Sequence, residues 1–155
     1  MIIVLADQVT KLLVEKHFQV GQVKEIVPGL FNLILTYNPG IAFGMLAKLD
    51  PGVRMLAMGG TTIVALIVII YLLVKEYRND SVGQVALIMV LAGAAGNIID
   101  RVRIGMVIDF LDFYYQKYHW PAFNVADSTI CIAVLLLLFR QARPIKEGVS
   151  GHFRL

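Results

Sequence analysis

The sequence predicts an all-α polytopic membrane protein with four transmembrane helices and a small extracytoplasmic β-sheet, in a single domain over residues 1–155. Composition is the first reason, because 58% of the residues are hydrophobic and only 16% are charged, whereas a soluble domain has roughly 45–50% and about 25%. Mean hydropathy is correspondingly high, at +0.74. The second reason is that the charges lie between long apolar runs. These features exclude an ordinary soluble enzyme and a disordered chain, and the basic residues form no stripe that a nucleic-acid binder would need.

Three apolar segments are each long enough to cross a bilayer. Residues 55–74 and 81–99 are free of charge, and residues 121–139 contain a single charge, Asp127. A bilayer core about 30 Å thick requires about 20 apolar residues in a helix. The three segments are therefore predicted to be transmembrane helices.

The N-terminal segment, residues 1–14, is predicted to be the outer end of a first, abbreviated transmembrane helix. It would rise only about 21 Å as a helix, and Asp7 and Lys11 interrupt its apolar run. These two residues are four apart with the acid first, so we expect them to form an ion pair at the helix end. A signal peptide is excluded, because the segment has no basic start and no cleavage motif of small residues.

Basic residues predict the orientation in the membrane. The loop after the second predicted helix contains Lys75 and Arg78. The much longer connection over residues 18–52 contains only two basic residues, Lys24 and Lys48. Because cytoplasmic loops are enriched in Lys and Arg, both termini are expected in the cytoplasm and the long connections outside.

The two outer connections have different patterns. Residues 23–35 are typical of two short strands around a Pro-Gly turn, and a second turn is predicted at residues 38–40. Residues 105–121 are rich in aromatic side chains, which we expect at the headgroup level of the membrane.

A polar group follows four small residues, 93–96, in the third predicted helix. The small residues permit a close approach by another helix or by a substrate. Asn97, Asp100 and Arg101 then share one helix face, because they lie at positions i, i+3 and i+4. Two interpretations remain open: a helix crossing with an Asp100–Arg101 pair, or a functional site in which Arg101 holds substrate carbonyls.

Asp109 and Asp127 are the strongest candidates for chemistry. Asp127 lies six residues after Pro121 and hence about 9 Å along a helix, where a carboxyl needs a partner. Asp109 approaches from the segment that follows the third predicted helix. Two carboxyls that meet at the outer membrane surface are able to share a proton, one acting as base and the other as acid. Asp112 is predicted to be exposed at the interface instead.

The sequence offers few residues for other catalytic mechanisms. The three histidines are scattered and have no metal-ligand spacing. Ser128 is not part of a nucleophile elbow and has no histidine near it in the sequence. Cys131, one turn after Asp127, is predicted to be a small buried hydrophobic residue. Carboxyl chemistry is what remains.

Five short motifs carry these polar residues. They are D-Q-V-T-K at 7–11, N-P-G-I-A-F at 38–43, G-A-A-G-N-I-I-D-R at 93–101, V-I-D-F at 107–110 and F-N-V-A-D at 123–127. In order and spacing, the set resembles the bacterial lipoprotein signal peptidases, also called signal peptidase II, over roughly residues 7–139. Members of that family usually have about a full helix before D-Q-x-T-K, whereas six residues precede it here.

The resemblance implies an aspartyl endopeptidase of the bacterial cytoplasmic (inner) membrane, with its active site near the outer surface. The family removes signal peptides from prolipoproteins, cleaves just before a diacylglyceryl-modified cysteine, and is the target of the cyclic peptide globomycin. The resemblance implies no metal and no organic cofactor. The implied partners are the diacylglyceryl-prolipoprotein substrate and membrane lipid, without nucleic acid or an obligate protein partner.

The resemblance also implies roles for individual residues. The catalytic pair corresponds to Asp109 and Asp127. Polar positions that line the family's site correspond to Asn38, Asn97, Arg101 and Asn124, and positions that support it correspond to Asp7 and Asp100. The alternative function is a non-enzymatic carrier, which would place ionisable groups near the bilayer midplane. The acids here cluster toward one surface, which favours the peptidase.

Overall fold

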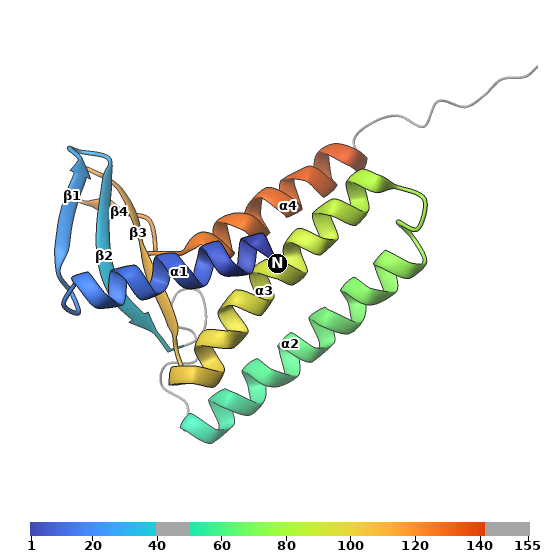
Figure 1. Ribbon diagram of the computed structural model, residues 1–155, viewed down its shortest axis with the longest axis horizontal. Coiled ribbons are helices and arrows are strands. Elements are labelled where there is room, and N and C mark those ends of the chain that lie inside the picture. Colours follow the sequence, from blue (N-terminus) through green and yellow to red (C-terminus); the bar gives the residue numbers. More distant parts are fainter. Residues whose placement is uncertain (40–49, 142–155) are drawn as a thin grey trace, which may run out of the picture.

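Four helices and four strands make up the described part of the protein, residues 1–39 and 50–141 of a computed structural model (Figure 1). In chain order they are α1 (Ile2–His17), β1 (Val23–Val27), β2 (Phe31–Asn38), α2 (Pro51–Val74), α3 (Ser81–Ile104), β3 (Val107–Tyr115), β4 (Tyr118–His119) and α4 (Val125–Gln141). The sheet lies at one end of the molecule, and α3 and α4 extend away from it side by side. Each of the four segments predicted to be helical thus forms a helix.

Helix α3 is the centre of the helical part, because α1, α2 and α4 all pack against it. The small residues in its second half make this packing possible. A Cβ atom at Gly93 would lie 2.6 Å from the carbonyl oxygen of Ala126 in α4, closer than side chains and backbone approach in practice. A Cβ atom at Gly96 would overlap the carboxylate of Asp7 in α1. The predicted close helix approach at residues 93–96 is therefore confirmed, with two helices as the partners.

Among the described helices, α3 alone has both the length and the hydropathy of a transmembrane helix, with 24 residues and a mean hydropathy of 1.9. The apolar part of α2, Gly59–Val74, is shorter. Helix α4 begins at Val125 rather than at Pro121 and has 17 residues. The number of helices is confirmed, whereas four crossings of the membrane stay a prediction.

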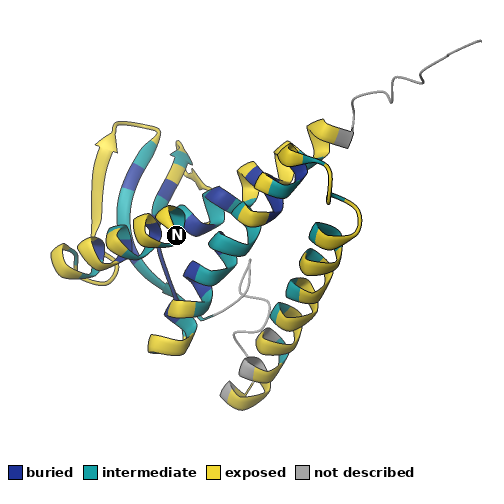
Figure 2. Cartoon of the chain, turned by 45° about the vertical axis from the view of Figure 1, so that its right-hand side comes forward, coloured by how far each residue is buried: buried dark blue, intermediate teal, exposed yellow. Residues whose placement is uncertain are grey.

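Helix α2 exposes apolar side chains along its length, among them Ile63, Ile67 and Ile70 (Figure 2). Soluble monomers rarely expose a continuous apolar surface of this kind. The exposed face is consistent with a helix that contacts lipid.

The sheet is antiparallel in the order β1-β2-β3-β4. The predicted hairpin over residues 23–35 is confirmed, and its turn contains Gly29 with a φ of +74°, a conformation that favours glycine. The second predicted turn, at residues 38–40, lies partly outside the described residues. Strand β3 is the main difference, because the aromatic segment predicted to lie at the headgroups contains the longest strand of the sheet.

An apolar core joins the sheet to the helices. It consists of Val14 from α1, Leu35 from β2, and Ile108 and Phe110 from β3, all of them buried. Ile108 and Phe110 flank Asp109 in the sequence. Packing these neighbours in the core therefore fixes the position of the Asp109 backbone next to the helices. Figure 2 shows buried segments at this junction and further ones where α3 and α4 pack together.

Candidate functional site

Asp127 lies in the first turn of α4, not about 9 Å along a helix as the sequence suggested. The helix begins later because Asn124 caps it. The Asp127 backbone N–H donates to Asn124 Oδ1 at 2.9 Å, and the Asn124 backbone N–H donates to Asp127 Oδ2 at 3.3 Å. This reciprocal arrangement is a capping box. Its N-x-x-D spacing, visible in the sequence, is the signal that would have located the start of the helix.

Asp109 reaches the same place from β3 and is only 2% exposed. Its carboxylate accepts hydrogen bonds from Asn38 Nδ2 at 2.9 Å and from Asn124 Nδ2 at 2.7 Å. The Asn124 side chain thus contacts both the Asp109 carboxylate and the Asp127 backbone. The predicted meeting of Asp109 and Asp127 is borne out to this extent: one amide side chain links them.

Asn97 approaches from α3 and completes the contacts of Asp127. Its Nδ2 donates to Asp127 Oδ1 at 2.7 Å, while its Oδ1 accepts from Lys11 Nζ at 3.0 Å and from Asn124 Nδ2 at 3.2 Å. Because the lysine can only donate, it requires the Asn97 oxygen on its own side. The amide NH₂ is thereby turned toward Asp127.

Lys11 forms two buried ion pairs, with Asp7 Oδ2 at 2.8 Å and with Asp100 Oδ2 at 2.7 Å. The predicted Asp7–Lys11 pair is confirmed, but it lies in the middle of α1 rather than at the helix end. The Asp100–Arg101 interpretation is wrong, because Lys11 is the ion-pair partner of Asp100 among the described residues. Lys11 was missing from the predicted site residues, although its i,i+4 spacing from Asp7 pointed to it.

Asp7 and Asp100 also hold the backbone next to the two central aspartates. Asp7 Oδ1 accepts the backbone N–H of Ala126 at 2.9 Å, one residue before Asp127. Asp100 Oδ2 accepts the backbone N–H of Ile108 at 3.2 Å, one residue before Asp109. Because Lys11 binds both acids, a single ammonium group holds two backbone segments relative to each other. One is the start of β3, which carries Asp109, and the other is the first turn of α4, which carries Asp127.

Arg101 lies beside a cavity of about 640 Å³ that both aspartates also line. Its Nε is buried and has no hydrogen-bond partner among the described residues. The cavity is otherwise bordered by Asn38, Asn97, Val107, Trp120, Pro121, Ala122, Phe123, Ser128, Cys131 and Ile132. It therefore combines two carboxylates and an unused donor with largely apolar walls, as expected for a site that binds a partly apolar ligand.

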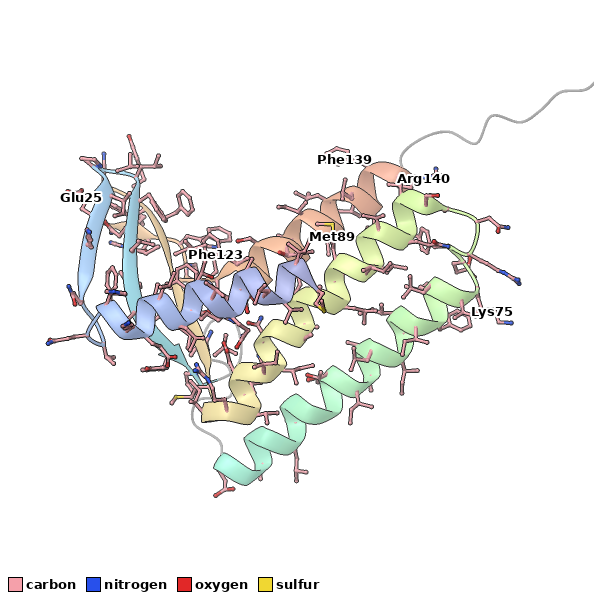
Figure 3. All side chains as sticks on the ribbon, in the orientation of Figure 1. Glu25, Lys75, Met89, Phe123, Phe139 and Arg140 are labelled. Atoms are coloured by element: carbon pink, nitrogen blue, oxygen red, sulfur yellow. The ribbon has the colours of Figure 1, made fainter. Side chains whose placement is uncertain are left out.

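Phe123 lies between the sheet and the start of α4 (Figure 3). Its carbonyl oxygen accepts the backbone N–H of Leu111 at 2.8 Å, and its own N–H donates to the Leu111 carbonyl at 3.1 Å. These two bonds attach the chain before α4 to β3. The capped start of α4 is thereby held against the strand that carries Asp109.

Burial raises the pKa of Asp109 to about 6, from an ordinary value of 3.8. The hydrogen bond from Asn38 opposes this rise, the negative charge of Asp127 adds to it, and the hydrogen bond from Asn124 again opposes it. A carboxyl with this pKa exchanges its proton near neutral pH, which suits acid–base chemistry.

Two predictions about neighbouring residues are wrong. Asp112 is buried rather than exposed, because it lies on the inner strand β3 and accepts hydrogen bonds from Asn32 Nδ2 at 2.9 Å and from His119 Nδ1 at 2.9 Å. Cys131 is exposed rather than buried. It follows Asp127 by one helical turn and so faces the same cavity.

Eight residues were predicted at the site: Asp7, Asn38, Asn97, Asp100, Arg101, Asp109, Asn124 and Asp127. Seven of them belong to one hydrogen-bonded and ion-paired network through Lys11 and Asn124, and Arg101 lies on the wall of the adjoining cavity. Within residues 1–39 and 50–141, no three His, Cys, Asp or Glu side chains are grouped in a way that would hold a metal ion.

Comparison with known proteins agrees with this geometry. The family model of signal peptidase (SPase) II matches residues 1–143. A lipoprotein signal peptidase of Syntrophus aciditrophicus is 42% identical over 94% of this chain and 91% of its own length, and one of Syntrophotalea carbinolica is 44% identical over 92% and 87%. A solved structure described as a bacterial membrane enzyme superposes with a TM-score of 0.79 at 31% identity, over 93% of this chain and 90% of that one. The chain therefore belongs to the signal peptidase II family of membrane peptidases.

Proposed function

We propose that this protein removes signal peptides from prolipoproteins by hydrolysing the peptide bond just before a diacylglyceryl-modified cysteine. Asp109 and Asp127 activate the water in this proposal. The observation that carries it is the arrangement of the two carboxylates, which line one cavity and are linked through Asn124. The names of the relatives support the same substrate class.

The proposed reaction uses the two carboxyls in opposite protonation states. The ionised member takes a proton from a water molecule, whose oxygen attacks the carbonyl carbon of the scissile amide. The protonated member donates its proton to the leaving nitrogen, the carbon–nitrogen bond breaks, and a carboxylic acid and an amine are released. Because the charge on one carboxyl changes the proton affinity of the other, the two groups titrate as a unit rather than as independent residues.

The surrounding polar residues have positioning roles in this proposal. Asn38, Asn97 and Asn124 orient the carboxylates through the hydrogen bonds described above. Arg101 uses its unpaired donor to bind a substrate carbonyl oxygen, which is the remaining interpretation of this residue. Asp7 and Asp100, held by Lys11, keep the two halves of the site in register.

The proposed setting is the bacterial inner membrane, with several membrane-crossing helices and both termini in the cytoplasm. The diacylated cysteine is anchored in the outer leaflet, so its peptide bond is presented near the outer surface. The apolar walls of the catalytic cavity suit a substrate that carries acyl chains. Lipid and the prolipoprotein are the proposed partners, and globomycin is the proposed inhibitor.

The test is incubation of the purified full-length protein, in lipid vesicles, with a synthetic diacylated prolipoprotein. Release of the signal peptide is expected, identified by mass spectrometry as cleavage directly before the modified cysteine. The same peptide without the lipid is the control and should be cleaved far more slowly. Absence of cleavage of the diacylated peptide by folded protein, or cleavage at another bond, would refute the proposal.

A further inference from the structure

A second cavity, of about 630 Å³, adjoins the catalytic cavity on the side of the sheet. The two cavities share five lining residues: Asn38, Asp109, Trp120, Pro121 and Ala122. The second cavity is otherwise bordered by residues of the sheet and its flanks, Val23, Ile34, Thr36, Tyr37, Pro39, Asp112 and His119. A chain that crosses Asp109 therefore passes from a cavity bordered by helices α3 and α4 into one bordered by strands.

The second cavity contains a buried carboxylate that the catalytic site does not use. Asp112 is 5% exposed and receives hydrogen bonds from Asn32 Nδ2 at 2.9 Å and from His119 Nδ1 at 2.9 and 3.0 Å to its two oxygens. The His119 ring stacks on Tyr114, with ring centres 5.2 Å apart and an angle of 13° between the planes. The orientation of the carboxylate is therefore set from two sides.

Negatively charged side chains predominate in the described lining of this cavity. Its described lining residues include Asp109 and Asp112 but no lysine or arginine, and His119 is the only lining group able to become positive. A ligand in this cavity therefore meets two acidic side chains, with no lysine or arginine among the described lining residues.

We propose that the second cavity binds the first polar residues of the mature chain, and that the Asp112–His119 pair selects them by charge. This inference rests on the proposed function, because it assigns the two cavities to the two sides of the scissile bond. The signal peptide, which is apolar, occupies the cavity beside α3 and α4. The mature chain leaves along the sheet, where basic or hydrogen-bond-donating side chains are favoured and acidic ones are disfavoured.

Strand geometry indicates which substrate residues lie beside Asp112. Asp112 is three residues after Asp109 on β3, and a strand rises about 3.3 Å per residue, so the two residues are about 10 Å apart. An extended substrate that passes Asp109 at its scissile bond has the same rise. Asp112 is therefore level with the third and fourth residues after the bond, the modified cysteine being the first.

The test is a set of diacylated prolipoprotein peptides that differ only at these two positions, which are both Lys, both Gln or both Glu. At about pH 8 and low salt, the wild-type protein should cleave the Lys peptide with a kcat/KM about tenfold above that of the Glu peptide, with Gln between them, because partly buried opposite charges attract and like charges repel. The difference should lie mainly in KM. Added salt should reduce it.

Two variants locate the selection. Asp112→Asn keeps the shape and should reduce the Lys-to-Glu ratio to within about twofold, because the charge is gone. His119→Asn keeps a donor near the Nδ1 position and should leave the ratio high at about pH 8. Glu76→Gln is the control: it removes an exposed carboxylate that lines neither cavity, and its ratio should equal that of the wild type. The ratio compares two substrates on one preparation, so partial unfolding of a variant does not change it.

The outcomes separate the two proposals. If none of the peptides is cleaved, the proposed function fails. If all three are cleaved at equal rates, or if Asp112→Asn keeps the full ratio, the proposed function stands and the second cavity does not select the mature chain by charge.

Discussion

Two pairs of aspartates lie side by side in this protein, all buried except Asp127, which is partly buried. They differ in the group that connects them. Asp7 and Asp100 share the ammonium group of Lys11, at 2.8 and 2.7 Å. Asp109 and Asp127 are connected by an amide, that of Asn124, and within residues 1–39 and 50–141 no lysine or arginine forms an ion pair with either of them.

The comparison shows how one residue type serves two purposes. An ammonium between two carboxylates forms charge-assisted hydrogen bonds to both, which fixes their positions relative to each other. A neutral amide orients a carboxylate without neutralising it, so burial is left to raise the pKa of Asp109 to about 6. The lysine-bound pair is therefore suited to hold the backbone, and the amide-bound pair is suited to exchange protons.

The largest effect is expected from the amide-bound pair. Asp109→Asn and Asp127→Asn keep the side-chain shape and remove the exchangeable proton, so each should lower kcat at least about a thousandfold, or ~4 kcal/mol of barrier. Because the pair acts as a unit, the double variant should be little worse than either single one. Signal-peptide release is the measurement. Glu76→Gln is the control, and near-normal activity of either single variant would contradict the two-aspartate proposal.

The lysine-bound pair should respond in stability. Lys11→Met leaves Asp7 and Asp100 buried without their cation, which should cost about 3–5 kcal/mol of unfolding free energy. Thermal unfolding in detergent measures this, with the exposed Lys75→Met as control. Adding Asp7→Asn and Asp100→Asn to Lys11→Met should restore part of the loss, because the uncompensated charges are then gone. If Lys11→Met is as stable as the wild type, the structural role assigned to the ammonium is wrong.

The pH dependence separates the pairs further. The pKa of Asp109 is raised from 3.8 to about 6 in the folded protein, so the folded state binds the proton more tightly than the unfolded state does. Asp109 therefore lowers stability as the pH rises through this interval, by about 3 kcal/mol in total. Asp109→Asn should be increasingly more stable than the wild type from about pH 4 to about pH 6. Unfolding curves across this range test it, and a constant difference would contradict the raised pKa.

The pH dependence of kcat should report the protonation of the same carboxyl, Asp109. As the pH falls below about 6, Asp109 becomes protonated, and a general base at this position is lost. The rate of signal-peptide release should then decline with an acidic limb near that pH. The measurement is kcat across the pH range on vesicles of constant composition. A rate that stays constant well below pH 5 would exclude a base with this pKa.

The smallest effect concerns access to the two pairs. Cys131 is exposed and lines the cavity that Asp109 and Asp127 border, whereas Lys11 is fully buried. Cys131→Ser should keep activity within about twofold. A bulky thiol reagent should slow the wild type by about tenfold, or ~1.4 kcal/mol, and should leave Cys131→Ser unaffected. Equal inhibition of both forms would mean that the reagent acts elsewhere.

Several local patterns were interpreted correctly because they depend on neighbours in the sequence. Long apolar runs predicted three of the helices, and the four-residue spacing of Asp7 and Lys11 predicted their ion pair. Strand β3 escaped prediction because its aromatic residues are equally typical of a membrane interface. The burial of Asp112 and the exposure of Cys131 depend on which face of β3 and of α4 meets another element, and no local pattern specifies that.

The sequence by itself determined the helical class, the first hairpin and the polar residues that gather at the site, since periodicity, turn residues and costly polar groups are local signals. Only the tertiary structure decided which aspartate has which partner. Lys11 contacts Asp100 across 89 positions of the chain, and Asn124, at the cap of a helix, contacts Asp109 near the start of a strand. These contacts form when α1, α3, β3 and α4 pack around the small residues of α3. The division between a pair that holds the structure and a pair suited to chemistry therefore comes from packing.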